Sequence, residues 1–124
     1  MKKLTLILTF YLIAFVSVAQ IIEPIKWSFD SNQDGKDVEL TFKASIDENW
    51  HLYDTYLPEG GPIPTSVVFQ DSSKFEFVGE LQKSPEPVEK YDPTFMMDLR
   101  YFSNEAILTQ NIRLKTDERV EING

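Results

Sequence analysis

The chain has 124 residues, of which 42% are apolar and 13% aromatic, a composition that excludes a disordered protein and fits one globular domain. Acidic residues number 20 against 12 basic ones, and the basic residues are scattered, which opposes binding to nucleic acid. The absence of cysteine excludes a disulfide scaffold, thiolate catalysis and cysteine-ligated metals within these residues.

Residues 1–19 have the pattern of a secretory signal peptide. A basic start precedes an apolar run at 4–18, which ends in the small residues that a cleavage site needs. An anchoring helix is the alternative, but the run is short for a membrane span of about 20 residues, and no basic cluster follows it. We therefore expect a soluble mature domain of residues 20–124 outside the cytoplasm. Removal of the leader takes away two lysines and leaves 10 basic against 20 acidic residues, a net charge of −10.

Alternating apolar and polar side chains predict β-strands along the mature chain. The clearest run is residues 38–46, where the side chains that face one way are Val38, Leu40, Phe42, Ala44 and Ile46. The other predicted strands are residues 24–30, 50–55, 66–70, 75–78, 95–102 and 106–114, with a polar Asp-Gly turn at 31–36. Because each strand has one apolar face that only a second sheet can cover, we predict an all-β antiparallel sandwich.

Two proline-rich segments are predicted to be loops. Residues 57–64 hold three prolines and two glycines, so they cannot donate a full ladder of hydrogen bonds, and residues 84–93 form the second such loop. Residues 120–122 look like the start of another strand, yet the chain stops at Gly124. The sandwich is therefore expected to lack its last strands.

No catalytic residue and no metal site are predicted. His51 is the only histidine and has no partners at the spacing of a metal site or a catalytic triad, so a structural role is favoured. Glu89 and Asp92 could act as acid and base of a glycosidase, but a sandwich of this size leaves little room for a substrate cleft. Met96 and Met97 suggest a copper site, but adjacent strand residues point to opposite faces, and at least one of the two is expected in the core.

The aromatic residues are predicted to divide between the core and a partner surface. An exposed row would suit sugar stacking, but most fall on the apolar side of an alternation and are predicted to be core: Trp27, Phe29, Phe42, Trp50, Phe69, Phe75, Phe77 and Phe102. Those in or beside the proline-rich loops are predicted to contact a partner: Tyr53, Tyr56, Tyr91 and Phe95.

Four segments, read in order, resemble one protein family. They are residues 25–29 (IKWSF), 50–53 (WHLY), 57–66 (LPEGGPIPTS) and 88–95 (VEKYDPTF). Together they are similar to the N-terminal periplasmic domain of the thiol–disulfide interchange proteins DsbD, also called the disulfide bond corrector domain. The resemblance spans nearly all of the mature chain, and its specific part is the pair of motifs EGGPIPTS and EKYDPTF.

The resemblance implies an immunoglobulin-like sandwich that is the terminal shuttle of a periplasmic reductant relay, without a cofactor. In that family of protein-disulfide reductases, electrons from the cytoplasm pass through a membrane domain and a thioredoxin-like domain of the same protein. They then reach envelope partners such as disulfide isomerases or cytochrome c maturation factors. The carrier is a cysteine pair on strands that follow the region matched here. Since exchange proceeds by thiolate attack on a disulfide sulfur, residues 1–124 cannot catalyse it.

A cap over the cysteine pair is also implied. The family shields its cysteines with a short flexible loop between two strands, and residues 89–93 stand where that loop is expected. An aromatic ring over a disulfide excludes water and stray thiols until a partner moves it. The predicted cap and partner-contact residues are Glu89, Lys90, Tyr91, Asp92, Pro93 and Phe95, with Tyr91 as the shielding ring. A simple proline-rich surface turn is the alternative.

Two origins of a chain without cysteine stay open. The sequence is either a fragment that ends before the cysteine-bearing strands, which we expect, or a redox-dead relative. The rival functions are a non-redox immunoglobulin-like module that binds a protein or glycan in the envelope, and a structural spacer. The gene beyond Gly124 separates them, because two closely spaced cysteines followed by apolar spans would identify the relay protein.

Overall fold

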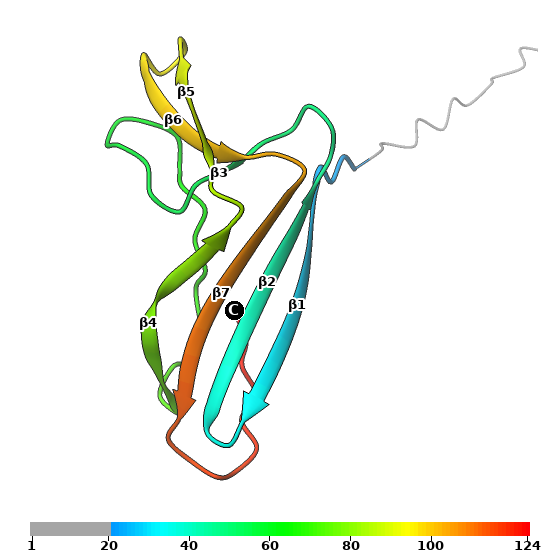
Figure 1. Cartoon of the computed structure of the whole chain (residues 1–124), viewed down its shortest axis with the longest axis vertical. Helices are drawn as coiled ribbons and strands as arrows, with labels where there is room; N and C mark the ends of the chain where they lie inside the picture. The colour runs from blue at the N-terminus through cyan, green and yellow to red at the C-terminus, as the bar shows by residue number, and fades with distance from the viewer. Residues whose placement is uncertain (1–20) are drawn as a thin grey trace, which may run out of the picture.

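The computed structural model describes residues 21–124, which form an immunoglobulin-like antiparallel β-sandwich (Figure 1). The strands are β1 (Ile25–Asp34), β2 (Asp37–Ile46), β3 (Leu52–Tyr53), β4 (Phe75–Ser84), β5 (Val88–Asp92), β6 (Met97–Phe102) and β7 (Glu105–Leu114). A large sheet has the order β1-β2-β7-β4, and a small sheet has the order β3-β6-β5. The described residues contain no helix, and the all-β prediction is confirmed. The predicted signal peptide lies outside them.

The β1–β2 hairpin is longer than predicted because its turn is very short. Pairing continues to Asp34 and Asp37, so only Gly35 and Lys36 form the turn, rather than all of residues 31–36. Gly35 has a φ of 64°, and glycine with positive φ at the first central position is what a type II′ turn requires. The turn and its alternating flanks therefore fix the register of the whole hairpin.

One face of the large sheet carries the core. Alternate residues of β2 and β7 are buried on this face, and two clusters form over its length. The first joins the large sheet to β6 of the small sheet and contains Ala44, Ile46, Ala106 and Phe102, with Ile25 and Leu52 packed against them. The second contains Val38, Leu40, Phe75 and Ile112, with Phe42, Phe69, Leu114 and Ile122 packed against them. The small sheet thus covers one end of the face, and segments outside the strands cover the other.

Residues 66–70 lie across the large sheet without forming the predicted strand. The nitrogen of Gln70 donates to the oxygen of Asn123 at 2.9 Å, which is a single contact rather than a ladder. The segment is held by side chains instead, since Phe69 packs against Phe75 and Phe77 with ring centroids 5.5 and 5.3 Å apart. The prediction of a strand here was wrong because alternation alone does not supply a backbone partner.

A groove remains open beside β1. Its volume is about 1090 Å³, and it lies between Trp27, Phe29 and Phe42 of the large sheet and the crossing segments 66–69 and 117–124. Phe29 is 72% exposed, although its alternation predicted a core position. The predictions that Trp27, Phe29, Trp50 and Phe77 are core residues were wrong, because these side chains are 38–72% exposed.

Truncation of two phenylalanine side chains tests which part of the apolar face of the large sheet is covered. Phe102 is 2% exposed, so Phe102→Ala should lower the free energy of unfolding by about 3–5 kcal/mol. Phe29→Ala should lower it by less than about 1 kcal/mol, because that ring already faces solvent. Urea unfolding of both variants at low micromolar protein concentration measures the difference. Equal losses would mean that the groove is filled in solution.

Candidate functional site

The residues predicted as a cap lie in a β-hairpin at one end of the molecule (Figure 1). Residues 89–92 belong to β5, which pairs with β6 from Val88 opposite Tyr101 to Asp92 opposite Met97. The prediction that residues 84–93 form a loop was therefore wrong for 88–92. Pro93 and Phe95 lie in the turn between the strands. The contact of these residues with a partner stays a prediction.

Asp92 shapes the turn of this hairpin. Its Oδ1 accepts hydrogen bonds from the nitrogens of Thr94 at 2.8 Å and Phe95 at 3.2 Å. Pro93 follows at the position where its fixed φ favours a turn, and Met96 ends the turn in the left-handed region with a φ of 53°. The carboxylate of Asp92 is thus engaged in local structure, which argues against its use as the acid or base of a glycosidase.

The loop of residues 57–64 packs against the hairpin. A Cβ at Gly61 would stand 3.1 Å from Sδ of Met97 and 3.3 Å from the oxygen of Pro58, so any larger residue would crowd this contact. The Gly61 nitrogen donates to that same Pro58 oxygen at 3.3 Å, which closes a tight turn. Leu57 is buried, and Met97 is half-buried. The loop with the motif EGGPIPTS and the hairpin with the motif EKYDPTF therefore form one unit in space.

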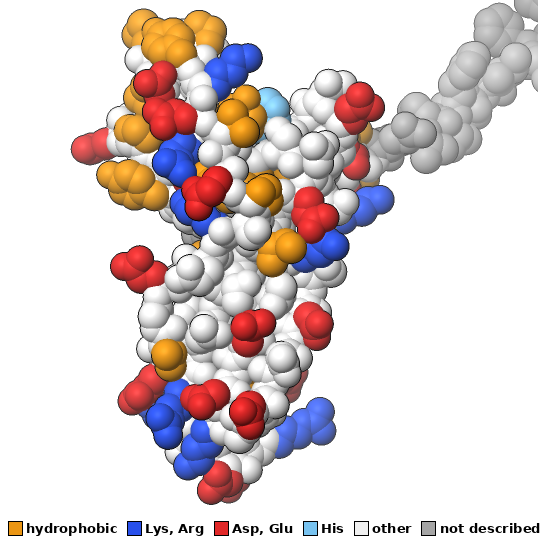
Figure 2. All heavy atoms as spheres, in the orientation of Figure 1, with side chains coloured by type: hydrophobic (Ala, Val, Ile, Leu, Met, Phe, Trp, Pro, Cys, Tyr) orange, Lys and Arg blue, Asp and Glu red, His pale blue; other side chains and the backbone are white. Residues whose placement is uncertain are grey.

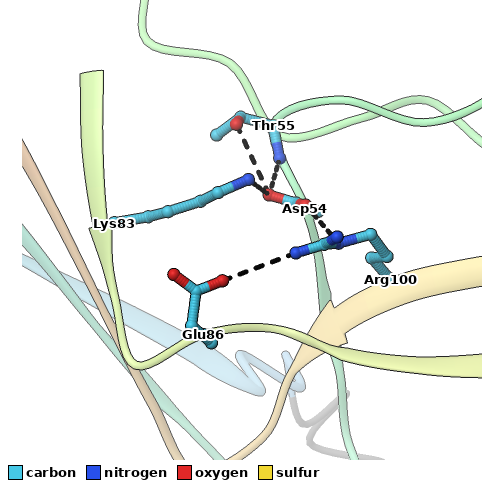
Figure 3. Close-up of polar contacts among 5 residues, drawn as sticks. All are labelled: Asp54, Thr55, Lys83, Glu86 and Arg100. Carbon is cyan, nitrogen blue, oxygen red and sulfur yellow. Dashed lines mark hydrogen bonds and ion pairs between the residues drawn. The ribbon is translucent and has the colours of Figure 1, made fainter. Parts of the chain in front are cut away.

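A buried carboxylate holds this unit together (Figure 3). The side chain of Asp54 is 2% exposed, and its Oδ1 accepts hydrogen bonds from Nζ of Lys83 at 2.6 Å and from the nitrogen of Thr55 at 2.7 Å. Oδ2 lies 3.2 Å from Nε of Arg100. This last pair is an ion contact without hydrogen-bond geometry, since Nε has no hydrogen-bond partner within the described residues.

The backbone of Asp54 ties the same elements. Its nitrogen donates to the oxygen of Arg100 in β6 at 3.0 Å, and its oxygen accepts from the nitrogen of Thr65 at 3.1 Å. Arg100 also reaches Glu86, with Nη2 and Oε2 3.5 Å apart. The two cations and two carboxylates sum to zero charge, so Asp54 is not buried as an unpaired charge. The network connects the ends of the loop to β4 and β6.

Apolar side chains gather at this end of the molecule (Figure 2). The exposed ones on the loop and the hairpin are Tyr56, Ile63, Val88, Tyr91 and Met96, whereas Tyr53 and Phe95 are half-buried. We call this set of five exposed side chains the apolar tip. An exposed apolar group on ordered elements is typical of a surface that contacts another molecule.

The other residues considered as catalytic or metal-binding candidates do not form such a site. His51 is exposed and stacks on Tyr101, with ring centroids 3.9 Å apart and an interplanar angle of 17°. Glu89 stands opposite Arg100 in the strand register, not beside a second reactive carboxylate. No group of three or more His, Asp or Glu side chains in residues 21–124 is placed to hold a metal ion. The same residues include no helix long and apolar enough to cross a membrane.

Sequence reasoning missed the Asp54 network. Asp54 and Lys83 are 29 residues apart, and neither stands in a pattern that marks a buried charge. The available signal was weak: Asp54 is an aspartate near the end of the predicted strand 50–55, shortly before the proline-rich loop. A partner so distant in sequence is found only when the topology is known.

Comparison of the chain with known protein families, with curated proteins and with solved structures found no match. The resemblance to the disulfide bond corrector domain therefore rests on the quoted motifs.

Loss of the Asp54 charge should loosen this unit. Asp54→Asn leaves the cations of Lys83 and Arg100 without their shared partner, and these side chains are 26% and 41% exposed. Because solvent partly screens them, we expect a loss of about 1–3 kcal/mol in the free energy of unfolding. Chemical denaturation measures the loss, and amide exchange at Thr65 should accelerate.

Asp117→Asn is the matched control. Asp117 pairs with Lys36 at 3.7 Å, but its side chain is 91% exposed. Its replacement should change the free energy of unfolding by no more than about 0.5 kcal/mol. Similar losses for both variants would show that Asp54 acts as an ordinary surface charge.

Proposed function

We propose that the chain is the periplasmic scaffold domain of a thiol–disulfide interchange protein, in which the apolar tip contacts envelope thiol–disulfide partners. The partners are thioredoxin-like or disulfide isomerase proteins, together with the membrane and thioredoxin-like domains of the full-length protein. The chain itself contains no sulfur nucleophile, so the cysteine pair that carries electrons belongs to a part of the protein outside residues 1–124.

The contact between the loop and the hairpin is the observation that supports this proposal. The two motifs that carry the resemblance are separated in sequence, yet Gly61 of the first packs against Met97, which lies opposite Asp92 of the second in the β5–β6 ladder. Both segments carry exposed apolar side chains, as a domain that docks on partners needs. An immunoglobulin-like sandwich alone would support many functions, because fold does not define function.

The position of Tyr91 supports a role for the apolar tip in electron transfer between thiol–disulfide partners. Tyr91 stands opposite Asp98 on the hairpin, and its ring is 57% exposed. A ring in this place is able to cover a neighbouring disulfide and to move aside when a partner docks. The turn at Pro93–Met96 is ordered by Asp92 at its start, so a movement of the ring does not require the strands to separate.

A non-redox binding module is the second candidate. The observation that favours it is the absence of cysteine from a chain that already presents an apolar surface. Such a module would use the same tip to hold a protein or glycan in the envelope. The genomic reading frame beyond Gly124 separates the candidates: two cysteines a few residues apart, followed by apolar spans, would establish the relay, whereas a stop codon would exclude it.

Removal of the Tyr91 ring should weaken docking without unfolding the domain. For Tyr91→Ala we expect partner affinity to fall by about tenfold or more, because exposed aromatic anchors carry much of the energy of such contacts. The measurement is an NMR titration of the chain with a periplasmic thioredoxin-like protein encoded in the same genome. Stability should change by no more than about 0.5 kcal/mol.

Phe77→Ala serves as the control for this titration. Phe77 is 53% exposed, close to the value for Tyr91, but it lies in the first half of β4, away from the tip. Its loss should leave affinity unchanged. If both variants bind as the parent does, the tip is not the docking surface.

A further inference from the structure

The outer edge of β1 has no strand beside it. β1 is the last strand on one side of the large sheet, where β2 is its neighbour (Figure 1). Among residues 21–124, no backbone hydrogen bond outside the ladders reaches Ile25–Asp34. Such an edge is a template for another strand unless charges or short length block it. β1 is ten residues long and flanks the open groove.

The register of the hairpin decides which residues face outward from this edge. Asp34 and Asp37 flank a two-residue turn, so they form a hydrogen-bonded pair, and even-numbered residues of β1 bond to β2. Odd-numbered residues then direct their backbone groups outward, from Ile25 to Gln33. A hydrogen bond of Ser31 is consistent with this assignment. Its backbone nitrogen donates to Oδ1 of the adjacent Asp30 at 2.8 Å and not to β2.

We propose that β1 pairs with β1 of a second copy of this chain, antiparallel about a two-fold axis at Ser28. In this register Lys26 lies opposite Asp30 of the other copy, and Trp27 lies opposite Phe29. Both pairs occur twice, because the interface is symmetric. The result is one continuous sheet of eight strands, formed from the two large sheets.

Charge selects this register among those that the edge permits. Pairing shifted by four residues in one sense brings Asp30 opposite Asp30, and in the other sense brings Lys26 opposite Lys26. The two registers in between place each of these charges opposite neutral residues. Only pairing about Ser28 forms two ion pairs with no like-charge contact. Charged side chains directly opposite each other on neighbouring strands interact most strongly, so these pairs favour this register.

The proposed pairing also covers apolar surface. Trp27 and Phe29 are on the groove side of β1, and both are exposed in the single chain. Across the two-fold axis Trp27 of each copy meets Phe29 of the other copy. Such aromatic pairs on one face of a sheet are favourable. The overall negative charge of each copy opposes association, but salt near 0.15 M screens it beyond about 8 Å, so the contacts at the edge decide.

A single introduced thiol tests the position of the axis. The chain has no cysteine, so Ser28→Cys supplies its only thiol. Residues opposite each other in a non-hydrogen-bonded pair have Cα atoms about 4.5 Å apart, within the range of a disulfide. With oxidised glutathione, this variant of the full chain, purified as the host exports it, should give a covalent dimer. Asn32→Cys should not, because the two introduced thiols would lie on opposite sides of the axis. Equal cross-linking of both variants, or none with Ser28→Cys, would overturn the proposal.

Charge reversal tests the pairs themselves. Lys26→Asp or Asp30→Lys alone should weaken dimerisation by about tenfold or more in sedimentation equilibrium, because two attractive pairs become repulsive. An equimolar mixture of the two single variants should restore association, since each Asp then meets a Lys. The Asp34→Lys control, outside the paired segment, should keep the parent constant. A monomeric parent chain, or a mixture no better than its components, would overturn the proposal.

Discussion

The requirement to cover the apolar face of the large sheet controls this architecture. β2 and β7 lie in the middle of that sheet and bury alternate residues along their length. A sheet with one such face needs a second layer. Here the layer has two kinds of cover: Phe102 of the small sheet at one end, and Phe69 and Ile122 from segments outside the strands at the other. Because cover is thinner near β1, the groove and the exposed rings of Trp27 and Phe29 lie there.

A second constraint follows from the prolines of the loop between β3 and β4. Residues 57–64 cannot join a sheet, so their position has to be fixed by other contacts. Asp54 supplies these at the start of the loop, through its carboxylate to Lys83 and Arg100 and through its backbone to Thr65. A buried carboxylate is weak evidence for net stability, since desolvation offsets much of its attraction. The main effect of Asp54 here is to fix the position of the loop, because its side chain connects the loop to two strands of different sheets.

The sequence predicted the centre of the fold better than its margins. Residues 38–46 and 106–114 were found nearly to the residue, because central strands with one buried face have the clearest alternation. The strand β5 was predicted as a loop, because prolines bracket it and only its pairing with β6 makes it a strand. Phe29 shows a different limit: alternation states which face a side chain is on, but not whether anything covers that face.

The candidate site was partly visible in the sequence. The motifs at 57–66 and 88–95 were recognised separately, and the contact of Gly61 with Met97, the strand partner of Asp92, brings the two segments together. Asp54, Lys83 and Arg100 were not visible, because each is an ordinary polar residue until the topology brings them together. Local pattern therefore identified the segments, whereas the interactions that fix them depend on long-range contacts.

The apolar tip and the β1 edge are physically independent surfaces. The side chains of the tip lie on or beside the loop and on the β5–β6 hairpin. These two segments are joined to the large sheet through Phe102 and the Asp54 network. The edge belongs to β1, whose only neighbouring strand among the described residues is β2. Pairing along β1 leaves the hairpin uncovered, so two copies joined in this way would each keep a tip for a partner. A substitution at Lys26 or Asp30 acts on the β1 edge and one at Tyr91 acts on the apolar tip, so the failure of either proposal leaves the other intact.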